Sequence, residues 1–124
     1  MKTLTANQQL WTDELNSGKH KQGKGGLQYG DRHCCLGVAC LVYERETGIK
    51  LDRHGGELIG GALRGGYGTV KEWLGLRESF GRMDPTGKDR TSLVVLNDHN
   101  SLSFEEIAKV IEDNSDLLFV EETA

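Results

Sequence analysis

The stretch CCLGVACLVY, residues 34–43, decides the fold expected for this chain. If this stretch forms a helix, apolar side chains cover nearly all of its faces, which is typical of a helix buried on every side. Gly48 supplies the residue expected just past the end of such a helix. Gly37 costs about 1 kcal/mol of helix propensity relative to alanine, which is tolerable where another element must approach closely. We therefore predict a central, buried helix over about 34–47.

One amphipathic helix is expected before this segment in the sequence and another after it. Residues 5–17 begin with a capping box, in which Thr5 and Gln8 satisfy each other's backbone N–H groups. Ser103 and Glu106 form a second capping box, ahead of apolar residues that recur at helical spacing. Both helices present one apolar stripe, so both are expected to pack on the core.

The remaining segments are short. Thr69 to Leu74 is predicted to be a short helix, and Leu27 to Tyr29 a strand. Residues 92–97 fit either a strand or one helical turn, and 117–120 fit an edge strand. The predicted fold is α+β, with three to four helices and the central helix packed on a small antiparallel sheet.

Length and charge narrow the possible functions. A chain of 124 residues has the usual size of one domain, so we predict a single domain over 1–124. The net charge of −4 argues against duplex nucleic acid as a partner, because that binding depends on neutralising phosphates. No apolar run approaches the roughly 20 residues of a membrane span, and no signal peptide is evident. A cytoplasmic location in the cell that makes the protein, no membrane partner and free cysteine thiols are therefore expected.

The connection GKHKQGKGGLQYGDRH, residues 18–33, is rich in glycine and lysine. It nearly matches the phosphate-binding loop GxxxxGK[ST], but Gly25 replaces the hydroxyl residue, and the loop follows a helix where the motif needs a strand. Hydrolysis of a nucleoside triphosphate is thereby excluded. Flexible backbone amides with Lys21, Lys24 and Arg32 could still surround a phosphate, and a solvated basic loop is the alternative.

Other polar residues could complete a ligand site. Asn97 and Asp98 can bind ribose hydroxyls or base edges, although such a pair also occurs as turn chemistry before a helix. Tyr67 could stack on a base and Arg64 could clamp a phosphate, with an exposed loop as the alternative. The predicted ligand-binding residues are Lys21, Gln22, Lys24, Arg32, His33, Arg64, Tyr67, Asn97 and Asp98. No metal site and no cofactor are predicted.

The adjacent thiols Cys34 and Cys35 allow a different class of function. A thiol at a helix start has a lowered pKa and gains nucleophilicity, and this segment is faintly similar to the cysteine-bearing helix of NlpC/P60-type peptidases. That family needs a histidine on a following strand, whereas His54 and His99 fall in predicted loops. A cysteine-dependent hydrolase is thus an alternative to thiols that serve as small core side chains.

Several motifs in one order carry a wider resemblance. They are KQGKGGL at 21–27, CCLGVAC at 34–40, VKEWLGL at 70–76, LND at 96–98 and SFEEIAKVIE at 103–112. Together they resemble a family of small bacteriophage and prophage proteins. The resemblance implies an accessory protein that antagonises host defence.

Our leading hypothesis is therefore a phage-encoded protein that binds and sequesters a small anionic ligand, a nucleotide immune signal, without catalysis. The alternative is an inhibitor that binds a host defence protein, using the acidic segment 98–122 to mimic nucleic acid. A glycine-rich chain of this size is also expected to self-associate as a homo-oligomer.

Overall fold

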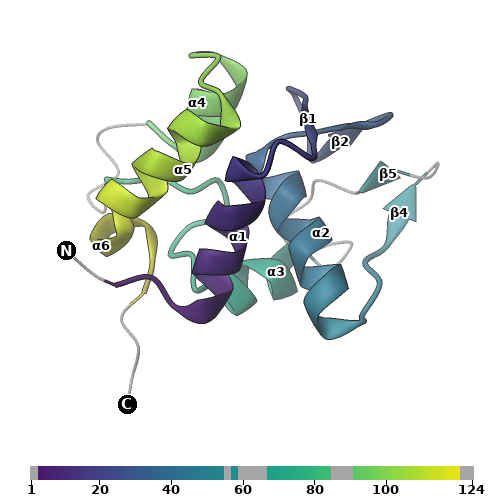
Figure 1. The fold of residues 1–124 in the computed structure, drawn as a ribbon, viewed down its shortest axis with the longest axis horizontal. Coiled ribbons are helices and arrows are strands. Elements are labelled where there is room, and N and C mark those ends of the chain that lie inside the picture. Colours follow the sequence, from purple (N-terminus) through teal and green to yellow (C-terminus); the bar gives the residue numbers. More distant parts are fainter. Residues whose placement is uncertain (1–2, 55–56, 59–66, 85–90, 121–124) are drawn as a thin grey trace.

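The structure is a computed structural model that describes residues 3–54, 57–58, 67–84 and 91–120. Helices dominate these ranges, and the strands are only two residues long (Figure 1). In chain order the elements are α1 (Ala6–Asn16), β1 (Lys21–Gln22), β2 (Gln28–Tyr29), β3 (Arg32–His33), α2 (Cys35–Thr47), β4 (Arg53–His54), β5 (Glu57–Leu58), α3 (Tyr67–Leu74), α4 (Leu93–Asp98), α5 (Phe104–Asp113) and α6 (Ser115–Leu118). No helix in the described ranges is long and apolar enough to cross a membrane.

The predicted central helix is confirmed. Every residue of α2 from Cys35 to Cys40 is buried, and the helix packs against α1, α3 and α4. The Cys34 side chain caps its first turn by accepting from the Gly37 N–H at 3.4 Å. Gly48 ends it with a φ of 74°, a left-handed conformation that glycine adopts without steric cost.

The two flanking helices are also confirmed, together with both capping boxes. Figure 1 shows α1 lying between α2 and α5, so that α1 contacts both. Trp11 and Leu15, four residues apart on α1, are fully buried. The Trp11 indole N–H donates to the Cys35 carbonyl at 2.9 Å, which satisfies its one polar atom inside the core.

The expected number of helices was wrong, because six occur in the described ranges where three to four were predicted. Residues 92–97, for which the sequence fitted either a strand or a helical turn, form most of α4 and its N-cap. The Ser92 hydroxyl caps the first turn of this helix. Leu93, Leu96 and Asn97 are all buried there, a spacing that only a helix provides. The edge strand expected over 117–120 is largely replaced by α6, and only a single bridge between Leu76 and Phe119 remains.

The sheet was also predicted wrongly, since it is mixed and not antiparallel. Its strand order is β1-β3-β2, with β3 parallel to β1 and antiparallel to β2. The glycine-rich chain after β1 turns back before β2, so β3 returns beside β1 in the same direction. A second pair, β4 and β5, is antiparallel and lies beyond α2 (Figure 1). The elements packed on α2 are mainly the helices α1, α3 and α4, with β3 as the contacting strand.

Gly37 allows the glycine-rich loop to lie directly on α2. A Cβ added at this position would overlap the Leu27 carbonyl oxygen and lie 3.2 Å from the His33 Cβ. The same carbonyl accepts from the Cys34 N–H at 3.3 Å. The element that approaches Gly37 closely is the backbone at Leu27, which explains why the helix tolerates a glycine at this position.

We expect Gly37→Ala to destabilise the protein by about 2 kcal/mol or more in urea or thermal unfolding, even though alanine is the better helix former. The reason is that a Cβ in a closely packed contact between backbones forces the loop off the helix. The matched control is Gly48→Ala, which adds a Cβ in open space and costs about 1 kcal/mol for its left-handed φ. Equal effects of the two substitutions would contradict this account of the loop contact.

Candidate functional site

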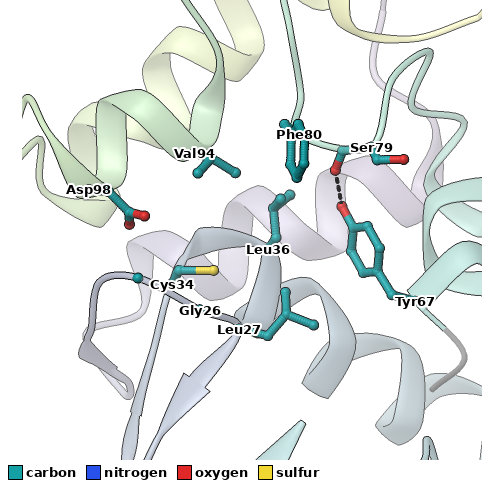
Figure 2. A pocket seen from close by; sticks show the side chains of 10 residues that line it. Gly26, Leu27, Cys34, Leu36, Tyr67, Ser79, Phe80, Val94 and Asp98 are labelled. Carbon is teal, nitrogen blue, oxygen red and sulfur yellow. Dashed lines mark hydrogen bonds between the residues drawn. The ribbon is translucent and has the colours of Figure 1, made fainter. Parts of the chain in front are cut away.

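A pocket of about 210 Å³ opens where the glycine-rich loop meets α2, α3 and α4 (Figure 2). Its walls come from the glycine-rich loop, the start of α2, the start of α3, the segment 79–80 and α4, and the described lining residues are mainly apolar side chains and glycine backbone. The lining residues are Gly25, Gly26, Leu27, Cys34, Leu36, Tyr67, Ser79, Phe80, Val94 and Asp98. Two of the predicted ligand-binding residues, Tyr67 and Asp98, are among them.

Asp98 supplies the charged group of this pocket. It lies at the last position of α4, and Figure 2 shows its carboxylate on the same side of the pocket as Cys34. Its Oδ1 accepts from the Asn97 side-chain amide at 2.9 Å. Within the described ranges, no group donates to Oδ2, so this oxygen has no hydrogen-bond donor among those residues.

Two aromatic residues occupy the opposite side of the pocket. Tyr67 is 3% exposed, and its hydroxyl donates to the Ser79 carbonyl at 2.6 Å (Figure 2). Burial raises the pKa of this phenol well above its usual value, so Tyr67 stays neutral. Phe80 is 49% exposed and lies at the pocket edge. The aromatic surface accessible to a ligand is therefore that of Phe80, and Tyr67 is a supporting wall.

Cys34 places a thiol in the pocket, but that thiol is protonated at neutral pH. Burial raises the pKa of Cys34 to about 11, and the nearby charge of Asp98 adds to the shift. Burial raises the pKa values of Cys35 and Cys40 as well. Proximity to a helix N-terminus does not lower these pKa values, because loss of solvation outweighs it. The arrangement argues against a thiolate nucleophile.

The three predicted cations of the loop have separate partners and do not line the pocket. Lys21 forms an exposed ion pair with Asp31 at 2.9 Å, and the Arg32 guanidinium donates to a backbone carbonyl at 3.3 Å. Lys24 donates to the Ser101 hydroxyl at 2.6 Å. Lys24 directly precedes two residues that line the pocket, Gly25 and Gly26.

Gln22 and Asn97 form a polar link that holds the loop to α4. The Gln22 side-chain amide donates to Asn97 Oδ1 at 2.8 Å and to the Leu102 carbonyl at 2.7 Å. Asn97 is fully buried and donates to the Gly23 carbonyl at 2.8 Å. Neither residue lines the pocket. Their bonds place Asp98, the residue after Asn97, beside the loop.

His33, another predicted site residue, is not among the residues that line the pocket. His33 is partly buried and lies 6.4 Å from His20 between ring centroids. Burial and the His20 charge lower the pKa of His33, so it is neutral at pH 7 and gives an anion no charge. Arg64 lies outside the described residues. No group of side chains in the described ranges could hold a metal ion.

Sequence reasoning missed Phe80, Val94 and the role of Gly25 and Gly26 as pocket walls. Phe80 stands alone in a polar, turn-rich stretch, where periodicity carries no information. Its neighbour Gly81 has a φ of 73° and lies close to the Leu93 side chain, which fixes the turn against α4. A lone aromatic residue followed by glycine in such a stretch was the only available signal.

Among models of known protein families, one described as a domain of unknown function, DUF8296, matches residues 4–115, a range that includes every described residue lining the pocket. No curated protein and no solved structure matches the chain.

We expect Asn97→Ala to lower the free energy of unfolding by about 2 kcal/mol, measured in urea. The substitution removes the donor to the Gly23 carbonyl and the acceptor of one Gln22 side-chain N–H. A buried polar group left without a partner lowers stability by about 1–3 kcal/mol. Asn100→Ala is the control, because Asn100 is exposed and its loss should change stability by less than about 0.5 kcal/mol. An Asn97 variant as stable as the control would contradict the structural role given to this residue.

We expect the native protein to react slowly with iodoacetamide at pH 6 to 7. A pKa of about 11 leaves roughly one Cys34 thiol in 10,000 ionised at pH 7, and the ionised fraction rises tenfold with each pH unit. Labelling followed by mass spectrometry, with the urea-unfolded chain as the reactive control, measures this. Native labelling at pH 6 faster than that of free N-acetylcysteine would contradict the assignment and favour the hydrolase alternative.

Proposed function

The chain belongs to this family, the domain of unknown function DUF8296, and we propose that it is a nucleotide-binding protein without catalytic activity. In this proposal the pocket holds the base and the loop around Lys24 holds the phosphate. The observation that carries the proposal is the pairing, in one small apolar pocket, of an exposed aromatic ring with a carboxylate oxygen that has no partner in the described ranges.

The size and lining of the pocket support a flat ring as the bound group. About 210 Å³ is less than the roughly 300–1,000 Å³ of pockets that enclose a drug-sized ligand, so a single ring system fits better than a whole nucleotide. The walls are apolar side chains such as Leu27, Leu36 and Val94. Phe80, half exposed at the edge, offers a face on which a base can stack.

The charge of Asp98 supports this orientation of the ligand. A carboxylate repels a phosphate at close range, particularly where apolar walls exclude water. It accepts hydrogen bonds from ring or exocyclic N–H groups, which nucleobases present at their edges. A nucleotide would therefore enter with its base inward and its phosphate outward.

Lys24 is the cation best placed for the phosphate. Its ammonium group bonds to Ser101, which follows Asp98 by three positions, and its own neighbours Gly25 and Gly26 line the pocket. The side chain thus spans from the glycine wall toward the end of α4. Lys21 is paired with Asp31 and contributes less.

The biological role that we propose is sequestration of a nucleotide signal by a phage-encoded accessory protein in the host cytoplasm. The motif resemblance to small phage and prophage proteins supports this setting. Protonated thiols and a single carboxylate in the pocket support binding without bond cleavage. Heating protein purified from a host with active immune signalling should release the bound nucleotide for mass spectrometry.

We expect ribonucleoside 5′-monophosphates to raise the melting temperature of the wild type, on the order of 10 °C at about 100 times the Kd. Phe80→Ala should weaken binding by about tenfold or more, since stacking on an aromatic side chain is worth about 1–3 kcal/mol per base. Ile49→Ala is the matched control, because it removes a similarly exposed apolar side chain at the far end of α2. Calorimetric titration measures each Kd.

In the same titrations, Lys24→Gln should weaken the monophosphate and leave the corresponding nucleoside unchanged, whereas Lys19→Gln should change neither. Failure of every monophosphate to raise the melting temperature would overturn the proposal. A stoichiometric host protein retained by the chain in place of a nucleotide would support the inhibitor alternative.

A further inference from the structure

We infer that the pocket prefers guanine over the other common bases, and that Asp98 sets this preference. The inference rests on the proposed function and adds the class of base to it. Three features of the pocket carry it: the position of the carboxylate, the occupancy of its oxygens and the lack of a second ionic group among the described residues that line the pocket.

The carboxylate of Asp98 acts only as an acceptor. Oδ1 takes one hydrogen bond from Asn97, and no described group donates to Oδ2. Because each carboxylate oxygen can accept about two hydrogen bonds, two adjacent N–H groups of a ligand can still bind in parallel, one on each oxygen. The group that fits this carboxylate is therefore an edge with two neighbouring donors.

Guanine is the common base that has such an edge. Its ring N1–H and its exocyclic N2 amino group are adjacent donors. Adenine and cytosine each place one amino donor beside a ring nitrogen that is an acceptor, and uracil places its single N–H between two carbonyl acceptors. Each of these three would direct at least one lone pair at the carboxylate, which repels it.

The surroundings of Asp98 fix its direction. The bond from Asn97 orients Oδ1, and Asn97 is itself held by Gln22 and by the Gly23 carbonyl. Such support limits the rotation of the acceptor, which increases discrimination between bases. Phe80 and the apolar wall contribute stacking that every base shares, so they add affinity without selecting the base.

The test compares guanosine, inosine and adenosine by calorimetric titration into wild type, Asp98→Asn and Asp52→Asn. Wild type should bind guanosine about tenfold or more tightly than adenosine, and inosine, which lacks the N2 amino group, should lie between them. Asp98→Asn presents one donor and one acceptor, which match adenine, so the preference should disappear or reverse. Asp52→Asn removes an exposed carboxylate and should keep the wild-type ratio.

The outcomes separate this inference from the proposal on which it rests. Guanosine and adenosine bound equally by wild type would overturn the guanine preference while leaving nucleotide binding intact. A wild-type preference retained in Asp98→Asn would overturn the role of Asp98. The inosine measurement needs no variant, so the inference stays testable even if Asp98→Asn does not fold. Absence of binding by every nucleoside and monophosphate would instead overturn the proposed function.

Discussion

The contact between the Leu27 carbonyl and Gly37 is the constraint on which the pocket depends. It brings the glycine-rich loop onto the most buried helix of the protein, at a distance that leaves no room for a Cβ. The Cys34 N–H binds the same carbonyl, so the start of α2 and the loop are fixed together. Gly25 and Gly26, just before Leu27, consequently become a wall of the pocket.

The pocket and the basic loop differ in chemistry although they are adjacent. Inside, apolar groups surround one carboxylate, and burial keeps the Cys34 thiol protonated. Outside, Lys21 and Lys24 are exposed and engaged with polar partners. A site divided in this way suits a ligand with an apolar, hydrogen-bonding end and an anionic end. The initial hypothesis placed the anion within the loop itself, whereas Lys21, Lys24 and Arg32 are not among the described residues that line this pocket.

Local signals in the sequence predicted the ranges of α1, α2 and α5 well. The capping boxes at Thr5 and Ser103, the apolar run of α2 and its terminal Gly48 each act within a few residues, and each occurs as predicted. For Gly37, the sequence showed only a helix position with poor propensity, and the structure identifies the Leu27 backbone as the element whose close approach requires a glycine there. Segments whose sequence fits a strand and a helix equally well were harder to predict. In α4, the helix is favoured because distant residues bury Leu93 and Asn97.

Non-local contacts explain what the sequence did not predict. The parallel pairing of β1 with β3 follows from the path of the loop across α2, which no pattern within either strand encodes. Of the predicted ligand-binding residues, Asp98 and Tyr67 line the pocket, whereas Asn97 and Gln22 do not line it and instead bond the loop to α4. Phe80 was missed because its place at the edge depends on how the turn around Gly81 packs on α4.

Chemical-shift mapping with guanosine 5′-monophosphate tests the central claim most directly. The account predicts that the largest changes in the amide spectrum occur at Gly25, Gly26, Phe80 and Asp98, with a smaller change at Lys24. Changes confined to the exposed lysines, or to the acidic residues of α5 (Glu105, Glu106, Glu112 and Asp113), would contradict it.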